Sequence, residues 1–299
     1  MNNKNLAAKY LWIVDTIVKY GRLSRRQFND LWMKSKFSDG NPMAERTFYH
    51  YRRGIEDTFN IDIACDRNGY YYIENDESPE VRQFTDWILD SNATTSAIQS
   101  IGTSSGRVEM EDVPSAREFL PVVAEAMQVN RRIVFTYAGF TKSRPEVGIL
   151  FSPYFLKYYK QRWYMFGEKD GGAMRTYALD RVTEMEITDM DFTIPADIKM
   201  SDFFGSIIGI TASKAETRDI ILRTTPTRAK YLRALPLHHS QTEETHDFYS
   251  VFRFRLKLNY ELVSEIMAMG PDVTVIAPRE LQLMVLERLK ETIANYRPL

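Results

Sequence analysis

The dipeptide Asn68-Gly69 is the local signal that most constrains how this chain folds. It separates two short runs, IDIACDR at 61–67 and YYYIE at 70–74, in which apolar and polar residues alternate. Because Asn and Gly both tolerate positive φ, the dipeptide favours the two-residue turn of a β-hairpin. The sequence therefore predicts two antiparallel strands in this region.

Three helices are predicted before the hairpin. Apolar residues recur at three-to-four-residue spacing over residues 6–20, as in an amphipathic helix. Ser24 with Gln27 three residues later fits a capping box, which indicates the start of a second helix. Pro42 stands at a plausible first position of a third helix, which we expect to end near Thr58.

The third helix is predicted to have one buried face and one face free to bind. Arg can bond guanine with two hydrogen bonds, and Thr can contact the methyl group of thymine, so its polar face suits the major groove of DNA. A solvated face without a ligand is the alternative. The predicted DNA-binding residues of this helix, the second helix and the hairpin turn are Arg25, Arg26, Gln27, Arg46, Thr47, Tyr49, His50, Arg53, Arg67 and Asn68.

Positive charge is concentrated at the same end of the chain. Residues 1–60 contain eleven Lys or Arg and six Asp or Glu, whereas the whole chain has a net charge of −1. This segregation is expected when a small module approaches phosphates and the remainder keeps the protein soluble. Three helices and a two-stranded wing over residues 1–77 resemble the winged helix-turn-helix of bacterial regulators, which implies binding to double-stranded DNA.

A change of composition marks a predicted linker at residues 78–114. The chain's 299 residues suggest two or three domains, at about 150 residues per domain. The linker begins with a polar break and contains TTSAIQSIGTSSG at 94–106, which is typical of a connection rather than a core. An apolar stripe around Trp87 is either a dimerisation surface or intramolecular packing.

Short β-rich runs follow a helix predicted at residues 116–130. Among them are SPYFL at 152–156, RWYM at 162–165 and RTYALDRV at 175–182. In this order the segments resemble the WYL domain, which is named for a Trp-Tyr-Leu run. Met165 replaces the Leu, and this substitution conserves volume.

The resemblance implies an Sm-like β-barrel over residues 115–192 that senses a nucleotide or single-stranded nucleic acid. The residues themselves support such a ligand, because guanidinium groups together with aromatic rings hold phosphates and stacked bases. Asp180 and Arg181 form either a structural ion pair or part of the site. The predicted ligand-binding residues are Tyr137, Arg144, Tyr154, Lys160, Arg162, Tyr164, Arg175 and Arg181.

Strand-like and helix-like segments alternate from residue 217 onward, which predicts an α/β sandwich over residues 193–299. This part resembles the C-terminal extension that commonly follows the WYL domain, a module associated with self-association and ligand response. The basic side chains of one strand are either an ordinary solvated sheet face or a nucleic-acid-binding stripe. They are Arg253, Arg255 and Lys257.

Enzymatic and metal-binding readings lack their motifs. No Walker A loop, GxGxxG, HExxH or CxxC sequence occurs. His238, His239 and His246 have no carboxylate or Cys partner at a spacing that suits a metal ion. The acidic run from Glu184 to Asp191 alternates as on an exposed edge strand, and a nuclease centre is its alternative reading. We predict no catalytic residue, metal site or cofactor.

Cellular location is predicted from cysteine use and hydropathy. Cys65 is the single cysteine, so no intramolecular disulfide can form, and its place in an alternating run predicts a small strand residue. No stretch approaches the ~20 apolar residues of a membrane-spanning helix, and the N-terminus lacks a cleavage pattern. We expect a cytoplasmic protein without a membrane partner.

Together these features predict an α+β multidomain transcription regulator that is not an enzyme. A small winged domain binds weakly alone, so we expect a homodimer that binds an inverted repeat. The architecture resembles the WYL regulators of bacterial phage-defence operons, which implies a repressor released by its ligand. A DNA-damage-responsive activator that senses single-stranded DNA is the first alternative, and a nucleic-acid-processing enzyme is the second.

Overall fold

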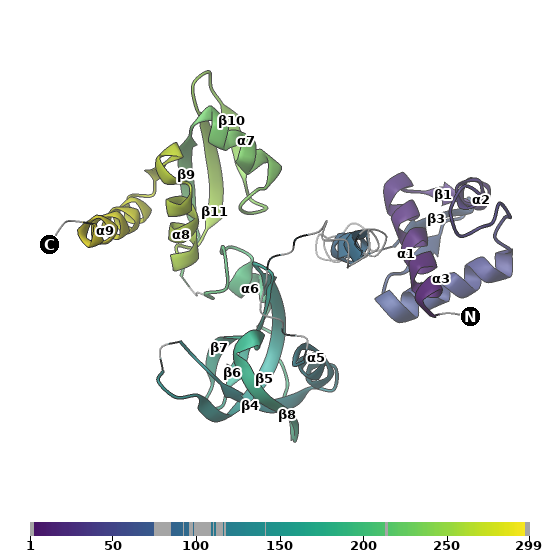
Figure 1. Cartoon of the computed structure of the whole chain (residues 1–299), viewed down its shortest axis with the longest axis horizontal. Coiled ribbons are helices and arrows are strands. Elements are labelled where there is room, and N and C mark those ends of the chain that lie inside the picture. Colours follow the sequence, from purple (N-terminus) through teal and green to yellow (C-terminus); the bar gives the residue numbers. More distant parts are fainter. Residues whose placement is uncertain are drawn as a thin grey trace. The chain divides into compact units, whose positions relative to one another are not determined.

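A computed structural model of the chain describes residues 3–74, 85–91, 93–95, 98, 109, 111, 116, 118–140, 142–212 and 215–296. The chain divides into two compact units, Met1–Glu111 and Asp112–Leu299 (Figure 1). Most of the predicted linker at 78–114 lies outside the described residues. Within it, Trp87 is half-exposed, and Leu89 packs against the apolar core of the first unit.

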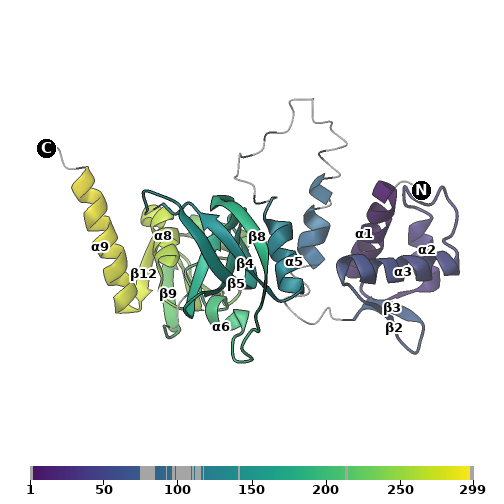
Figure 2. The same cartoon turned by 90° about the horizontal axis from the view of Figure 1, so that it is seen from below.

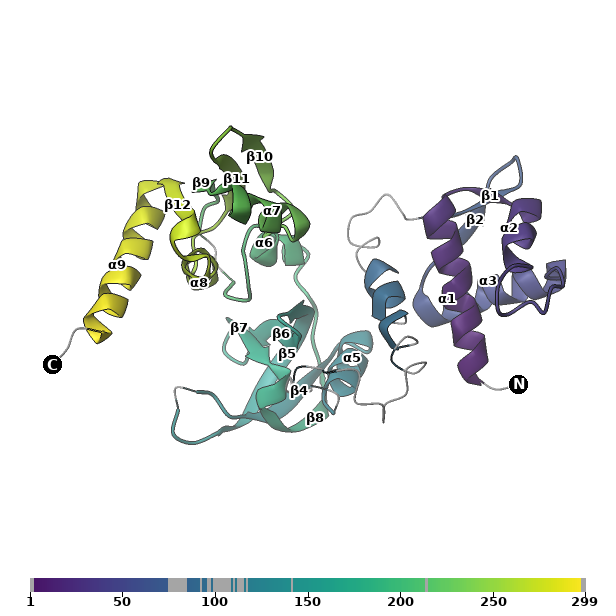
Figure 3. The same ribbon diagram turned by 45° about the horizontal axis from the view of Figure 1, so that its top comes forward.

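The first unit has a single apolar core beneath a small antiparallel sheet. The strands pair in the order β1-β3-β2, and α1 crosses α3 (Figure 3). Ile13, Phe28, Phe48 and Ile55 have at most 1% of their surface exposed. The elements up to residue 74 are α1 (Asn3–Tyr20), β1 (Leu23–Ser24), α2 (Arg25–Trp32), α3 (Glu45–Phe59), β2 (Ile63–Cys65) and β3 (Tyr70–Ile73).

The predicted capping box at the start of α2 is confirmed. Gln27 Oε1 accepts a hydrogen bond from the Ser24 backbone N–H at 2.9 Å, and Ser24 Oγ accepts one from the Gln27 backbone N–H at 3.4 Å. These contacts satisfy donors that the first turn of a helix leaves without partners.

The predicted start of the third helix at Pro42 is wrong, because α3 begins at Glu45. Met43 is 5% exposed, and both its backbone groups bond to α2. Its N–H donates to Asn29 Oδ1 at 3.1 Å, and its carbonyl oxygen accepts a hydrogen bond from Arg25. These tertiary contacts hold the chain extended ahead of α3.

The predicted hairpin is present, but its loop contains three residues rather than two. Gly69 N–H donates to the Asp66 carbonyl oxygen at 3.0 Å, and Gly69 has φ +80°. Asp66 Oδ1 also accepts hydrogen bonds from the backbone N–H groups of Asn68 at 2.8 Å and Tyr70 at 3.0 Å. A turn followed by a Gly in the left-handed region is a common alternative hairpin loop.

The second unit begins with α5 (Leu120–Gln128), which is shorter than the helix predicted at 116–130. It contacts β4, β5 and β8 of a five-stranded antiparallel sheet (Figure 2). The strand order is β7-β6-β5-β4-β8. The elements are β4 (Arg131–Tyr137), β5 (Glu146–Tyr159), β6 (Arg162–Lys169), β7 (Ala173–Ala178), the short helix η1 (Leu179–Arg181) and β8 (Val182–Asp191).

The predicted closed barrel is not found among the described residues. β7 and β8 form opposite edges of the sheet and do not pair with each other. On β7, Thr176 Oγ1 instead donates to the carbonyl oxygen of Ile210 at 3.3 Å. The edge of β7 is therefore bordered by a connecting segment rather than by β8.

The rest of the second unit is a four-stranded antiparallel sheet packed with helices. The strand order is β10-β11-β9-β12, and Phe252, Phe254 and Leu256 of β11 are buried against α7 and α8. The elements are α6 (Met200–Phe204), β9 (Arg218–Thr224), α7 (Pro226–Ala234), β10 (Thr242–Thr245), β11 (Ser250–Leu256), α8 (Tyr260–Ala268), η2 (Gly270–Asp272), β12 (Val273–Ala277) and α9 (Arg279–Asn295).

The mixed α+β class predicted from the sequence is confirmed by these sheets and helices. α6 and β10 were not predicted. In the part of the chain that the structure describes, we find no helix with the length and apolarity needed to cross a lipid bilayer.

Candidate nucleic-acid interface and ligand site

α3 separates buried apolar side chains from exposed polar ones. Phe48 and Ile55 are fully buried, whereas Arg46, His50 and Arg53 are exposed. Spacings of four and three residues place these polar side chains on one side of the helix. Tyr49 is also exposed and Thr47 is half-buried. The five predicted residues of α3 thus lie on or beside one solvent-facing surface.

The hairpin turn presents Arg67 and Asn68 to solvent on a fixed loop. Asp66 holds the turn, and the hydrogen bond from the Tyr70 backbone N–H is the main cause that lowers the pKa of its carboxyl group. Arg22 adds an ion pair with Asp66 at 3.3 Å. The ionised carboxylate therefore orders the loop from within.

Arg25 and Gln27 are engaged inside the unit, unlike Arg26. The Arg25 guanidinium lies 4.5 Å from the centre of the Phe48 ring, and it donates to Asn29 Oδ1 at 3.0 Å and to the Met43 carbonyl oxygen. The Gln27 side chain is used in the capping box. Arg26 is exposed and available for a phosphate.

Arg22 and Arg52 lie near the same surface and were not predicted. The Arg22 guanidinium is 4.7 Å from the centre of the Tyr72 ring. Arg52 lies 5.9 Å from the Tyr49 ring and 6.0 Å from the Tyr71 ring. Their sequence signal was the general excess of basic residues, because the contacts of Arg22 with Tyr72 and of Arg52 with Tyr71 join elements far apart along the chain.

In the second unit, Arg162 and Tyr164 of β6 lie close to Asp180 of η1. Arg162 Nε donates to Asp180 Oδ1 at 3.2 Å, and a second hydrogen bond joins Arg162 Nη2 to Asp180 Oδ2. This contact raises the pKa of Arg162. The sequence left open an ion pair between Asp180 and Arg181. Among the described residues, the carboxylate of Asp180 pairs with Arg162 instead. The charge of Arg162 is therefore already balanced within the protein.

Arg181 is the less committed cation of this cluster. Its guanidinium lies 3.4 Å from the centre of the Phe140 ring, whose side chain is 81% exposed. Its Nε is buried and has no hydrogen-bond partner among the residues that the structure describes. A buried N–H without a partner is costly, and no ion pair among the described residues balances the charge of Arg181. Phe140 was not predicted as a site residue.

Tyr137 and Tyr164 complete what we call the Arg181 cluster, which comprises Tyr137, Phe140, Arg162, Tyr164, Asp180 and Arg181. Burial raises the pKa of Tyr164. The pKa is lowered by the charges of Arg162 and Arg181, and it is raised by Asp180 and Tyr137. Tyr137 Oη accepts a hydrogen bond from the Ala178 backbone N–H at 3.4 Å. Four of the eight predicted ligand residues are thus brought together.

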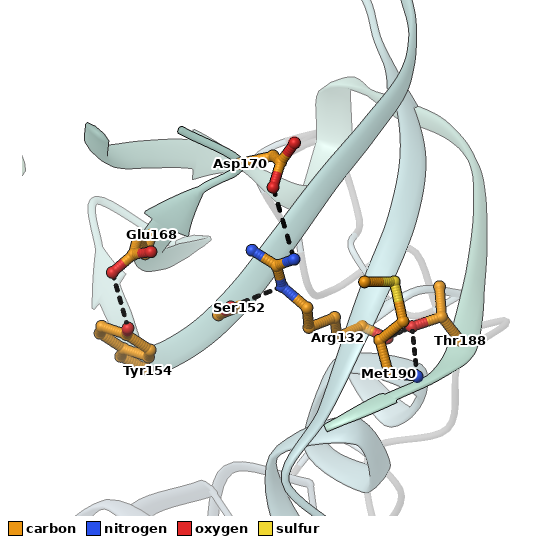
Figure 4. A network of polar contacts seen from close by, with 7 residues as sticks. All are labelled: Arg132, Ser152, Tyr154, Glu168, Asp170, Thr188 and Met190. Carbon is orange, nitrogen blue, oxygen red and sulfur yellow. Dashed lines mark hydrogen bonds and ion pairs between the residues drawn. The ribbon is translucent and has the colours of Figure 1, made fainter. Parts of the chain in front are cut away.

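The other four predicted ligand residues have separate surroundings. Tyr154 is buried and donates to Glu168 at 3.1 Å, beside a network in which Arg132 contacts Ser152 and Asp170 (Figure 4). Burial raises the pKa of Tyr154 to about 12.

Two of these four residues, Lys160 and Arg175, make polar contacts outside the Arg181 cluster. Lys160 Nζ pairs with Glu265 of α8 at 2.7 Å. Arg175 is exposed, and its Nη1 donates to the carbonyl oxygen of Met174 at 3.0 Å. Arg144 is exposed in the loop before β5. The eight predicted residues do not form one continuous site.

Two protein families match the second unit. The model of the WYL domain family matches residues 118–187, and that of the WCX domain family matches residues 216–293. The chain therefore contains one region similar to the WYL domain and one similar to the WCX domain. A search of curated proteins found no match.

Two solved structures are similar to the chain. Proteasome accessory factor B/C (PafBC) of Arthrobacter aurescens has 20% sequence identity and a TM-score of 0.36, with 99% of this chain and 48% of that chain covered. A CRISPR Cas-related protein has 11% identity and a TM-score of 0.34, with 59% and 50% covered. The chain thus spans about half the length of each of these structures, at 48% and 50%.

In the WCX domain, the basic strand face is paired with acidic side chains. Arg253 lies 3.6 Å from Glu244, and Arg255 lies 3.7 Å from Asp219. These cross-strand pairs favour the reading of an ordinary sheet face. The rings of His238 and His239 contact each other, while His246 stacks on Tyr249. Among the described residues, no three His, Cys, Asp or Glu side chains are arranged to hold a metal ion.

Replacing Arg25 by Ala is expected to destabilise the first unit by about 2 kcal/mol, because a half-buried cation loses two hydrogen bonds and its contact with Phe48. Urea unfolding followed by tryptophan fluorescence measures this loss. Arg26→Ala is the matched control and should leave the unfolding midpoint unchanged. Equal effects of the two substitutions would show that Arg25 is not a structural residue.

Proposed function

We propose that the chain is a sequence-specific DNA-binding transcription regulator, with the N-terminal unit as its DNA-binding domain. The observation that carries the proposal is the exposed polar face of α3 above a fully buried apolar face. A helix held in this way can enter the major groove without losing its own packing. The hairpin of β2 and β3 fits the wing of a winged helix-turn-helix, with Arg67 and Asn68 at its tip.

The proposed contacts divide into two kinds. Arg46, Thr47, His50 and Arg53 face the bases, where hydrogen bonds and methyl contacts distinguish one base pair from another. Arg26 and Arg67 contact phosphates, with Tyr49 and Asn68 beside them, because phosphate contacts position the protein without carrying sequence information. Arg25 supports this surface from inside the unit, and Gln27 supports it through the capping box of α2.

Arg53→Ala is expected to weaken binding to a duplex from the region upstream of the protein's own gene by about tenfold or more, since one good base contact contributes about 1–3 kcal/mol. Fluorescence anisotropy of the labelled duplex at two salt concentrations measures this affinity. Arg255→Ala, which removes an exposed arginine of the WCX domain, should have no effect. Unchanged binding by Arg53→Ala would count against α3 as the recognition helix.

The WYL domain is proposed to bind a nucleotide or single-stranded nucleic acid at the Arg181 cluster. The exposed Phe140 ring offers a stacking surface, and the Arg181 guanidinium that contacts this ring offers positive charge to a phosphate. Arg162 is saturated by Asp180 and therefore contributes geometry more than charge.

We expect Arg181→Gln to weaken binding of a short single-stranded oligonucleotide by about tenfold, because it removes a charge-assisted hydrogen bond. Titration of a fluorescent oligonucleotide against the full chain provides the measurement, with Arg255→Gln as the control. An affinity that does not change on removal of Arg181 would place the ligand elsewhere.

Self-association through α9 is the third part of the proposal. One side of α9 carries large apolar side chains that are between 41% and 56% exposed, namely Leu283, Leu286, Leu289 and Ile293. Leu281 of the same helix is fully buried in the WCX core. A second copy of α9 is the simplest cover for such a stripe, and a twofold pair suits an inverted repeat.

Replacing both Leu286 and Ile293 by Glu is expected to convert the homodimer into a monomer, because charges would then face each other across the interface. Light scattering after size exclusion measures the mass in solution. Glu280→Gln, a polar change at the start of α9, serves as the control. A dimer that persists in the double variant would require another interface.

The most specific part of the proposal is repression of a phage-defence operon. Its support is the resemblance of the sequence to regulators of such operons. A footprint that overlaps the polymerase-binding region of the target promoter would support repression. A footprint upstream of that region would instead favour activation.

A further inference from the structure

The segment 205–212, which we call the strap, connects α6 to the WCX domain and is bound along its length. The Lys257 backbone N–H donates to the Ser206 carbonyl oxygen at 2.7 Å. Asn259 Nδ2 donates to the Ile208 carbonyl oxygen at 2.7 Å, and Asn259 is 6% exposed. The first half of the strap is therefore held by the WCX domain.

Glu261 of α8 binds the second half of the strap. Its Oε1 accepts hydrogen bonds from the Ile210 N–H at 3.2 Å, the Thr211 N–H at 3.0 Å and the Thr211 hydroxyl at 2.8 Å. The approach is close because Gly209, at φ +86°, has no side chain, and a Cβ there would lie 2.4 Å from Glu261 Cγ. Three hydrogen bonds to one carboxylate oxygen fix this part of the strap against α8.

The same segment also contacts the WYL domain. Thr176 of β7 donates to the Ile210 carbonyl oxygen at 3.3 Å. Just before the strap, the Phe203 and Phe204 rings of α6 pack 4.7 Å and 5.1 Å from the Phe166 ring of β6. The strap is thus a shared wall between the sheet of the WYL domain and helix α8 of the WCX domain.

A pocket of about 350 Å³ lies between β7, α6 and the strap. Its volume is at the lower end of those that take small ligands. Most of its wall is apolar, Thr176 and Thr211 add hydroxyl groups, and among the described residues that line it the one charged side chain is a cation. Glu261 lies behind this wall, where its carboxylate is bonded to Thr211. The lining residues used in this argument are Phe166, Met174, Phe203, Ile210, Ala212 and Arg175.

Arg175 forms no ion pair with any residue that the structure describes, and its one hydrogen bond is to the neighbouring carbonyl oxygen of Met174. An unpaired guanidinium beside an apolar cavity favours a ligand with an apolar body and a single anionic group.

We propose that this pocket binds a small amphipathic anion, such as an aromatic carboxylate, whose ring lies against Phe203 and Ile210 and whose carboxylate meets Arg175. The site is separate from the one proposed for nucleotides and does not depend on whether the chain binds DNA. Since the ligand contacts residues 210–212, it touches the part of the strap that Glu261 holds. Both domains of the second unit therefore respond to its presence.

Naphthalene carboxylate and its neutral carboxamide are the probes, titrated into the full chain by calorimetry. The carboxylate should bind about tenfold more tightly than the carboxamide, because only the carboxylate carries a negative charge and forms an ion pair with the guanidinium. In Arg175→Gln the two probes should bind equally. Ala212→Phe, which fills the pocket, should weaken both, and Arg255→Gln should change neither.

Hydrogen exchange of the unmodified chain gives a second readout that needs no variant. Amide exchange at residues 206–212 should slow when the carboxylate is added, and exchange in α1 and α3 should not. Absence of binding at millimolar concentration, unaltered binding by Ala212→Phe, or unaltered strap exchange each overturns the site. A carboxylate preference that persists in Arg175→Gln overturns the assigned anion contact.

Discussion

The Phe48 ring is the contact on which the proposed DNA-binding surface depends. It has no exposed surface, and it packs 4.9 Å from the Phe28 ring of α2 and 4.8 Å from the Tyr71 ring of β3. These edge-to-face contacts fix the rotation of α3 about its own axis, since Phe48 cannot turn outward without opening the core. That rotation decides which side of α3 faces solvent. The positions of Arg46, His50 and Arg53 follow from an apolar contact that they do not touch.

The arginines of the chain differ by what surrounds their guanidinium groups rather than by their charge. Arg25 donates two hydrogen bonds inside the first unit, and Arg162 is neutralised by Asp180. Arg181 contacts the exposed Phe140 ring, and its Nε has no partner among the described residues. A sequence shows only that each is cationic. Burial without a partner costs free energy that a bound anion recovers, so the unpaired group indicates where a ligand gains most. This reasoning applies to Arg181, whereas the exposed Arg175 takes its role from its place on the wall of an apolar pocket.

Features that depend on neighbours along the chain were predictable from the sequence. The Ser24 capping box, the hairpin around Gly69 and the alternation of β11 each involve residues within a few positions of one another. The start of α3 was not predictable, because Met43 is held by Asn29 and Arg25 of another helix. The partner of Asp180 and the aromatic contacts of Arg22 were missed for the same reason. The open edge of β7 likewise depends on Ile210, which lies 34 residues after its hydrogen-bond partner Thr176.

The strap shows how contacts of modest individual strength produce a shared element. Glu261 concentrates three donors on one oxygen, while its Oε2 is buried without a hydrogen-bond partner. An unsatisfied carboxylate oxygen is costly, so the carboxylate stays in place only because the strap occupies its other oxygen. The WYL sheet holds the strap by fewer polar contacts than the WCX domain does. A ligand that contacts residues 210–212 and slows their motion therefore also restrains Glu261, so a change beside β7 reaches helix α8 of the WCX domain.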